Sequence, residues 1–251
     1  RVSKTVDVDT LLMALSQQVL EMRPEQELHE LVESKMVRPK ETKDYMVAVG
    51  GLQKLVKQLG PEWNVRPFGS SANGFGMTGS DLDVTCYRVD VDEQNRETAI
   101  RELRDKFVPL LQTDKRFVLV KAVWQARVPI LKLKFEGRLD VDLSCQNTEA
   151  ILNTELLKAY AKLSPLVRQL VLAVKLWGKH QGVSGATNGH LSSYSLTLMT
   201  IYFLQVHPDL MLPRLPTEAF THHVPVPNFD HLRWNFQVPL PDLLSSFFYF
   251  Y

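Results

Sequence analysis

Hydrophobic residues recur at helical spacing at both ends of the chain and alternate with polar residues in its middle. Over residues 40–59, Met46, Val49 and Leu52 fall on one face of a helix, and Gly60 is expected to end it as the C-cap. The same spacing, with proline and serine as stop and start signals, predicts six further helices. They cover Asp9 or Thr10 to Pro24, residues 25–36, 93–111, 148–163 and 165–180, and a stretch from Ser192 or Ser193 to Pro208.

Strand patterns are confined to the segment between Asn64 and Ser144. Alternation of hydrophobic and polar residues predicts strands over residues 64–68, 81–88, 117–124, 128–135 and 138–144. Pro129 has no N–H to donate, so it must lie at a strand start or a sheet edge. This order predicts an α/β (α+β) protein in which a catalytic domain with a mixed sheet, residues 40–146, is inserted into a helical domain, residues 1–39 and 147–251. Two such lobes form a cleft, where ligand sites are common.

The composition is that of a globular protein and narrows the possible partners. Of 251 residues, 45% are hydrophobic and 23% are charged, and no apolar run is long enough to span a membrane. Because the net charge is +1, a polyanion would need a local groove. Cys86 and Cys145 lack the spacing of a zinc site and favour a reducing compartment. The chain begins at Arg1 rather than Met, so we expect the natural N-terminus to lie upstream. We predict an intracellular protein, cytoplasmic or mitochondrial.

The segment from Phe68 to Val84 combines a Gly-Ser turn with an Asp-x-Asp pair. Asp81 and Asp83 are two apart on a predicted strand, so both carboxylates point to the same face. Neighbouring carboxylates repel each other unless a cation lies between them, and Mg²⁺ prefers such oxygen ligands. Backbone N–H groups of the turn at Gly69 and Ser70 could bind phosphates. Together these parts predict metal-assisted nucleotidyl transfer.

A third acidic position follows on a later predicted strand. Asp140 and Asp142 share one face of that strand, and either carboxylate could be a third metal ligand. Two-metal transfer needs a carboxylate on the metal that activates the attacking hydroxyl, so at least one of the two is expected in that role. The simpler alternative is that one or both are solvated residues.

Two features of the helical segments could bind a nucleotide. Lys175 and Lys179 are four apart and share a helix face, where they could hold a triphosphate or simply face solvent. Ser193 and Tyr194 open the next helix, whose first N–H groups could bind a phosphate while the tyrosine ring stacks on a base. A tyrosine at a helix start is more often a core residue.

Taken in order, these motifs resemble the signature of the noncanonical poly(A) polymerases and terminal uridylyltransferases, members of the polymerase-beta-like nucleotidyltransferase superfamily. The resemblance covers most of the chain from about Lys40 onward. It lies in residues 67–76, 80–83, 127–130, 141–144, 175–179 and 189–196, with Asn147, Asn153 and Thr154 between them. One departure is that the later acidic motif of the family, and its base-selecting residue, do not occur before Tyr251.

The resemblance implies a polymerase-beta-like catalytic domain, a helical central domain and a site assigned residue by residue. Asp81, Asp83 and Asp142 match the metal ligands, which implies Asp142 rather than Asp140 and two Mg²⁺ or Mn²⁺ ions. The matched nucleotide-binding positions are Phe68, Gly69, Ser70, Asn147, Thr154, Lys175, Lys179, Ser193 and Tyr194. Among these, the two lysines match triphosphate contacts and the tyrosine matches the ring that stacks on the base.

The resemblance also implies a template-independent RNA 3′-terminal nucleotidyltransferase. We predict uridylyl transfer from UTP first and adenylyl transfer from ATP second, with an RNA 3′ end as acceptor. Enzymes that use small acceptors or make oligoadenylate share the Gly-Ser and Asp-x-Asp motifs, but the stretch 189–195 argues against them. Another alternative is an inactive RNA-binding or assembly subunit, which a missing carboxylate would mark, and here all three are present.

Candidate RNA contacts are few, as the net charge requires. Lys132 and Lys134 share a strand face, and Arg101 and Arg104 share a helix face, so each pair could touch phosphates. We expect weak, sequence-tolerant RNA binding, with the choice of RNA left to protein partners or to segments missing from this chain.

Overall fold

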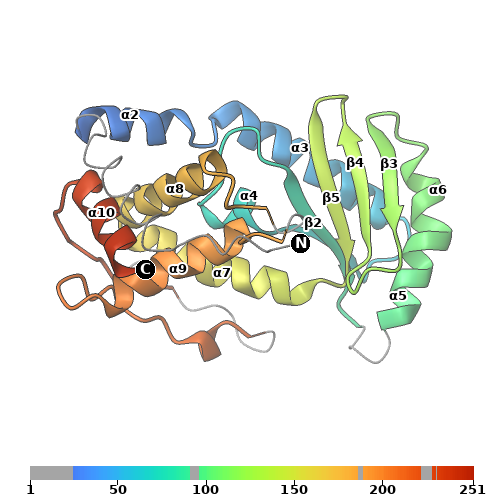
Figure 1. Ribbon diagram of the computed structural model, residues 1–251. Helices are drawn as coiled ribbons and strands as arrows, with labels where there is room; N and C mark the ends of the chain where they lie inside the picture. Colours follow the sequence, from blue (N-terminus) through green and yellow to red (C-terminus); the bar gives the residue numbers. More distant parts are fainter. Residues whose placement is uncertain (1–24, 91–95, 186–188, 222–227, 230) are drawn as a thin grey trace, which may run out of the picture. The chain divides into compact units, whose positions relative to one another are not determined.

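The computed structural model describes residues 25–90, 96–185, 189–221, 228–229 and 231–251 (Figure 1). The chain divides into two compact units. The helical unit is made of three segments: the chain up to Lys35, Tyr160–Leu215 and Asn228–Tyr251. The sheet unit runs from Met36 to Ala159 and resumes at Pro216. The predicted catalytic domain, residues 40–146, lies inside the sheet unit.

A five-stranded mixed sheet forms the centre of the sheet unit. Its strands are β1 (Trp63–Pro67), β2 (Leu82–Arg88), β3 (Phe117–Val123), β4 (Ile130–Phe135) and β5 (Leu139–Cys145), in the order β1-β2-β5-β4-β3. β2 and β5 run parallel, and the other neighbouring strands are antiparallel. The pairing therefore brings two acidic strands that are far apart in the sequence side by side. It confirms the predicted mixed α/β class.

Helices cover one face of this sheet. They are α3 (Pro39–Val56) and a continuous helical stretch made of α5 (Arg96–Glu102), a π turn (Leu103–Phe107) and α6 (Val108–Leu111). A short helix, α4 (Ser70–Asn73), lies against β2.

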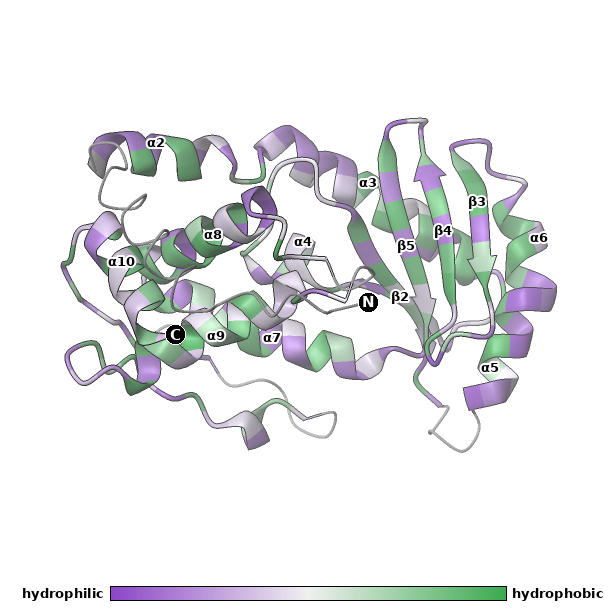
Figure 2. Cartoon of the chain, viewed as in Figure 1, coloured by the Kyte–Doolittle hydropathy of each residue, from purple (hydrophilic) through white to green (hydrophobic). Residues whose placement is uncertain are grey.

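Alternation along the strands decides which side chains enter the core. Leu82 and Val84 of β2 and Leu143 of β5 are fully buried in the cluster that the covering helices complete. Hydrophobic and hydrophilic residues alternate along β4 and β5 in Figure 2. Asp83 and Asp142 alternate with these core residues, so they point to the opposite face of the sheet.

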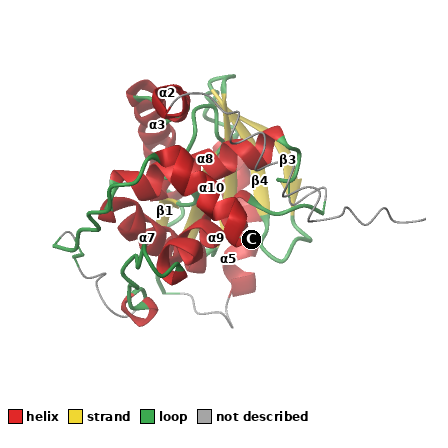
Figure 3. Cartoon of the chain, turned by 60° about the vertical axis from the view of Figure 1, so that its left-hand side comes forward, coloured by secondary structure: helices red, strands yellow, loops and turns green. Residues whose placement is uncertain are grey.

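The helical unit packs α2 (Glu25–Ser34), α8 (Pro165–His180), α9 (Ser193–Val206) and α10 (Leu240–Phe250) around its own core. α7 (Thr148–Leu163) leads from the sheet unit into it. Figure 3 shows α8, α9 and α10 side by side, and aromatic rings such as Trp177 and Phe248 join them. None of the helices in the described part of the chain has the length and apolar character that crossing a membrane requires.

Most predicted elements are confirmed, and two of the predicted helices are corrected. The helix predicted over residues 40–59 ends at Val56, with Lys57 as its C-cap, so Gly60 does not cap it. The helix predicted over 93–111 contains the π turn, because Pro109 has no N–H to donate and interrupts the α-helical ladder. The last helix, α10, is rich in aromatic residues, of which Phe247 and Phe248 are buried and Tyr249 is exposed. The helix predicted from Asp9 or Thr10 lies outside the described residues.

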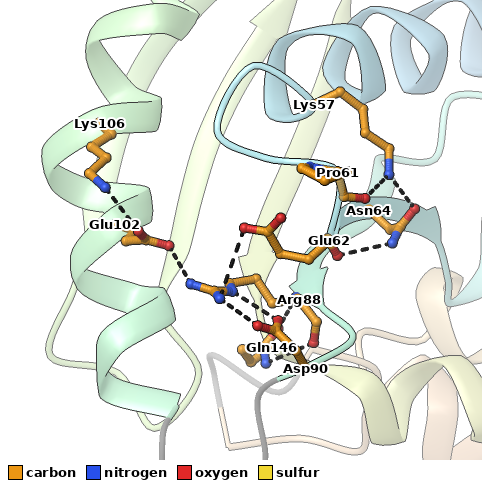
Figure 4. Close-up of polar contacts among 9 residues, drawn as sticks. All are labelled: Lys57, Pro61, Glu62, Asn64, Arg88, Asp90, Glu102, Lys106 and Gln146. Carbon is orange, nitrogen blue, oxygen red and sulfur yellow. Dashed lines mark hydrogen bonds and ion pairs between the residues drawn. The ribbon is translucent and has the colours of Figure 1, made fainter.

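Arg88, the last residue of β2, ties this strand to its neighbours (Figure 4). Its guanidinium donates to Glu102 of α5 at 2.7 Å and to Asp90 at 2.6 Å and 3.0 Å. Its backbone N–H donates at 2.7 Å to the side chain of Gln146, which adopts a left-handed conformation between β5 and α7. The network thus fixes the turn that leads to Asn147.

We expect Arg88→Leu to lower the free energy of unfolding by about 1–3 kcal/mol, because it removes charge-assisted hydrogen bonds from a largely buried guanidinium. Arg104→Leu is the control, since Arg104 is exposed and forms an ion pair with its neighbour Asp105. Urea denaturation of both variants measures the difference. Equal stability losses would contradict a structural role for the Arg88 network.

Candidate active site

The sheet register places two of the predicted metal ligands next to each other. β2 and β5 are parallel neighbours, and Asp83 is paired with Asp142 while Leu82 is paired with Val141. Neighbouring strands lie about 5 Å apart, so the two carboxylates start from adjacent backbone positions on one face. Asp81 precedes β2 and shares the parity of Asp83. The register thus puts Asp142, rather than Asp140, directly beside Asp83.

The three carboxylates interact electrostatically. Burial, followed by the charges of Asp142 and Asp81, raises the pKa of Asp83 to about 7. The pKa of Asp81 is also raised, first by partial loss of hydration and then by Asp142 and Asp140. The fold therefore places three acidic side chains near one another, and their negative charge is unfavourable unless a cation binds there.

Two lysines of β4 lie opposite the acidic residues of β5. Lys132 is paired with Asp142, and its ammonium lies 2.9 Å from the carboxylate. Lys134 is paired with Asp140 in the same way at 2.6 Å. Both lysines are predicted RNA phosphate contacts, and in this structure each forms an ion pair with a carboxylate of its own sheet.

Gly69 connects the sheet to the loop that is predicted to bind the nucleotide. Phe68 donates its N–H to the Asp83 carbonyl at 3.0 Å, and Gly69 follows with φ 68° and ψ −154° as the N-cap of α4. The predicted Gly-Ser turn is therefore the entry to a short helix that begins at Ser70. A Cβ on Gly69 would lie 2.6 Å from Oδ2 of Asp83, so glycine keeps the space beside this carboxylate open.

Hydrogen bonds within the sheet unit hold Asn147 and Thr154 in place. Thr154 is buried, and its hydroxyl accepts the Gly69 N–H at 2.9 Å and donates to the Ala150 carbonyl at 2.6 Å. Asn147 donates its backbone N–H to the Thr85 hydroxyl at 3.1 Å. Both residues were predicted as nucleotide contacts; in this structure Thr154 fixes the loop at Gly69, and the Asn147 backbone is anchored to β2.

Gly69→Ala should therefore damage both the loop and the acidic site. Only glycine adopts this backbone conformation readily, so we expect a stability loss of about 1–3 kcal/mol, and the new methyl group would push the Asp83 carboxylate aside. Gly137→Ala is the control, because Gly137 also has a positive φ but nothing lies within 4 Å of the position that its Cβ would take. Thermal melts and transfer assays should show loss of activity in Gly69→Ala alone, whereas equal activity in the two variants would contradict this role.

Two residues of α3 that sequence reasoning missed hold the loop before Asp81. The Glu41 carboxylate accepts hydrogen bonds from the Thr78 hydroxyl and the Gly79 N–H, each at 2.8 Å, and Tyr45 donates its hydroxyl to the Ser80 carbonyl at 3.0 Å. A small pocket beside them is lined by Glu41, Asp44, Tyr45, Gly79, Ser80, Asp81, Arg138, Leu139 and Asp140. The sequence contains no signal for these contacts, since they join segments more than thirty residues apart.

The remaining predicted nucleotide-binding residues lie in the helical unit. Lys175 on α8 is buried, and burial lowers its pKa to about 8, whereas Lys179 one turn later is exposed. Ser192 is the N-cap of α9, so Ser193 and Tyr194 occupy its first turn. Tyr194 is 46% exposed as a residue, so it is accessible as a stacking surface and is not a core residue.

The sheet residues suit a divalent metal chemically. Asp81, Asp83 and Asp142 offer the oxygen ligands that Mg²⁺ and Mn²⁺ prefer, the raised pKa values of Asp81 and Asp83 reflect a need for positive charge, and Gly69 leaves space beside Asp83. Within the described residues, no three His, Cys, Asp or Glu side chains are already arranged as a metal site. A metal would therefore have to draw the three carboxylates together and take the place of Lys132 at Asp142.

A mixed sheet that carries paired aspartates beside a glycine-led loop defines the class of polymerase-beta-like nucleotidyltransferases, and solved structures support this assignment. The chain belongs to the family described as "Poly(A) RNA polymerase, mitochondrial-like, central palm domain", whose model matches residues 25–162.

Three similar proteins show where the chain falls within this class. It is 35% identical over 208 residues to poly(A) RNA polymerase GLD2-A of Xenopus laevis; the match covers 78% of this chain and 40% of that protein. The structure of a GLD-2/RNP-8 complex matches with a TM-score of 0.78 and 28% identity, covering 89% of this chain and 72% of that one. A Cid1 poly(U) polymerase mutant bound to MgATP matches with a TM-score of 0.75 and 26% identity, covering 90% and 72%. The chain therefore spans less than half the length of the GLD2 relative.

Proposed function

We propose that this chain carries the catalytic centre of a template-independent RNA 3′-terminal nucleotidyltransferase that transfers AMP from ATP. The observation that carries the proposal is the in-register pair of Asp83 and Asp142, with Asp81 on the same face, on a polymerase-beta-like sheet. Membership of the poly(A) RNA polymerase family supports it.

In this proposal Asp81, Asp83 and Asp142 hold two Mg²⁺ or Mn²⁺ ions. The metal would supply positive charge that acidifies the RNA 3′-hydroxyl and stabilises the leaving pyrophosphate. The protein fixes the ligand positions through the β2–β5 register and keeps the loop at Gly69 in place through Thr154. The Mg-containing Cid1 structure supports a divalent metal.

Nucleotide contacts are proposed at the loop that follows Gly69 and, separately, on α8 and α9. We assign the triphosphate to Lys175, Lys179, Ser70 and Ser193, and stacking of the base to Tyr194. Phe68 and Asn147 would lie beside the sugar or base. The buried ammonium of Lys175 and the accessible ring of Tyr194 support these roles, because phosphates need positive charge and a base needs an exposed aromatic face.

Adenylyl transfer now ranks ahead of the uridylyl transfer that we predicted first. GLD2-A is named a poly(A) RNA polymerase, and the GLD-2/RNP-8 structure is among the similar folds. Uridylyl transfer stays the second candidate, because Cid1 is a poly(U) polymerase whose structures concern UTP selectivity. The GLD-2/RNP-8 complex also supports the expectation that a protein partner helps to choose the RNA.

An extension assay tests the proposal. A labelled short RNA is incubated with the protein, Mg²⁺ and each of the four NTPs separately, with Asp83→Asn as the inactive control. We expect a ladder with ATP that the control lacks. A ladder with UTP alone would select the second candidate. No extension under any condition, or equal extension by the control, would contradict the proposed function.

A further inference from the structure

Lys132 occupies the position at Asp142 where a metal ion would have to bind. Its ammonium lies 2.9 Å from Oδ2 and 3.2 Å from Oδ1, so it contacts both carboxylate oxygens. The register of β4 and β5 pairs the two residues directly, so the contact follows from the sheet itself. The lysine side chain is 49% exposed, which leaves it room to move into solvent.

The charge of Lys132 reaches the whole acidic group. Its attraction opposes the repulsion that acts on Asp81 and Asp83 as well as on Asp142. One ammonium supplies a single positive charge to three carboxylates, whereas a divalent cation supplies two and can bind all of them. The ammonium and a metal cannot use the same Asp142 oxygens at the same time.

On the basis of the proposed metal-dependent transfer, we propose that Lys132 is an exchangeable counter-ion for the metal site. It neutralises Asp142 while no metal is bound and gives up the carboxylate when a divalent cation enters. Lys132 is thus a positioning residue that acts through Asp142. Breaking a partly exposed ion pair costs little, so the exchange is reversible.

The exchange has a consequence for the order of binding. A free divalent cation must displace Lys132, so it binds weakly by itself. A nucleoside triphosphate adds negative charge of its own, so the cation and the triphosphate favour each other at the site, and the released ammonium gains a nearby anion. Lys132 therefore controls how tightly the site binds a metal ion when no nucleotide is present.

The lysine–aspartate pair two residues along the same two strands supplies a matched control. Lys134 is paired with Asp140 across the same two strands, and its ammonium lies 2.6 Å from that carboxylate. Lys134→Met removes the same charge from the same strand without freeing Asp142. Lys132→Arg keeps a positive charge opposite Asp142 and serves as the conservative variant.

The test is a Mn²⁺ titration of the chain without nucleotide, in which the electron paramagnetic resonance signal of free Mn²⁺ is followed. The proteins are the wild type, Lys132→Met, Lys132→Arg, Lys134→Met and Asp83→Asn. We expect Lys132→Met to bind Mn²⁺ about tenfold more tightly than the wild type, because a positive charge beside the site is removed. Lys134→Met should change the affinity much less, and Lys132→Arg should bind no more tightly than the wild type.

Unchanged or weaker binding by Lys132→Met would overturn the inference, and so would an equal gain in Lys134→Met. Should Lys132→Met fail to fold, Lys132→Gln, which also lacks the charge, takes its place in the titration. Binding by the wild type that Asp83→Asn abolishes supports the proposed metal site independently of Lys132. Absence of Mn²⁺ binding in every variant would contradict the metal site and the inference together.

Discussion

Asp83→Asn is expected to abolish nucleotidyl transfer and, at the same time, to stabilise the metal-free protein. Loss of a metal ligand removes several kcal/mol of transition-state stabilisation, which corresponds to a rate loss of about a thousandfold or more. Stability should rise because Asp83 is partly buried beside Asp142 and Asp81, and a neutral amide removes that repulsion.

The stabilisation should depend on pH in a defined direction. The pKa of Asp83 is about 7 in the folded protein and near 3.8 when unfolded, so between these values the folded state binds more protons. The stability that protonated Asp83 contributes is fully present below pH 4 and is lost as the pH rises through 7. The advantage of Asp83→Asn should therefore be largest above pH 7 and vanish near pH 4.

Thermal melts in EDTA from pH 4 to pH 8, combined with transfer assays, check both effects. Asp140→Asn is the control for activity, because Asp140 pairs with Lys134 rather than with Asp83. Asp142→Asn should also be inactive but should gain less stability, since it loses the ion pair with Lys132. An active Asp83→Asn variant, or one destabilised at pH 8, would show that Asp83 does not belong to a strained metal site.

The sequence predicts the parts of the acidic site but not their pairing. Alternation places Asp81 and Asp83 on one face, as the burial of Leu82 and Val84 shows. It cannot choose between Asp140 and Asp142, because both share a parity on β5. The choice comes from the register that sets Asp83 beside Asp142, and register depends on contacts between strands that lie far apart in the sequence.

The sequence predicted the start of a helix correctly where a single capping residue determines it. Ser164 caps α8 before Pro165, as predicted, because a hydroxyl acceptor followed by proline suits a helix start. The predicted end of α3 was wrong, because a glycine such as Gly60 can adopt many backbone conformations and does not have to cap a helix. The π turn depends on how Pro109 is accommodated within a longer helix, which periodicity does not show.

The sequence alone did not predict which charged side chains contact each other. Lys132 and Lys134 were predicted to touch RNA because lysines on a strand face suggest a phosphate path. The structure shows that the facing strand supplies carboxylates at both positions. The same limit applies to Glu41 and Tyr45, whose partners near Asp81 follow only from the packing of α3.

Lys175 provides the second large effect that we expect. Its side chain is buried on α8, and a charged contact to phosphate is worth about 1.5–3 kcal/mol, so Lys175→Met should raise KM for every NTP by roughly ten- to a hundredfold. The relative use of ATP and UTP should stay the same, because phosphates carry no information about the base. Initial rates with ATP and UTP measure this, and a changed preference would contradict the assignment to the triphosphate.

The lowered pKa of Lys175 makes this contact sensitive to alkaline pH. Its pKa is about 8 in the folded protein, so the ammonium is lost as the pH rises through 8, and the wild-type KM for ATP should increase there. Lys175→Arg keeps its charge at these pH values and should remove that increase. Since the unfolded pKa is near 10.5, the folded protein binds fewer protons between pH 8 and 10.5, and wild-type stability should rise with pH over this window, unlike that of Lys175→Met. A wild-type KM that does not change between pH 7 and pH 9 would mean that the Lys175 ammonium does not bind the triphosphate.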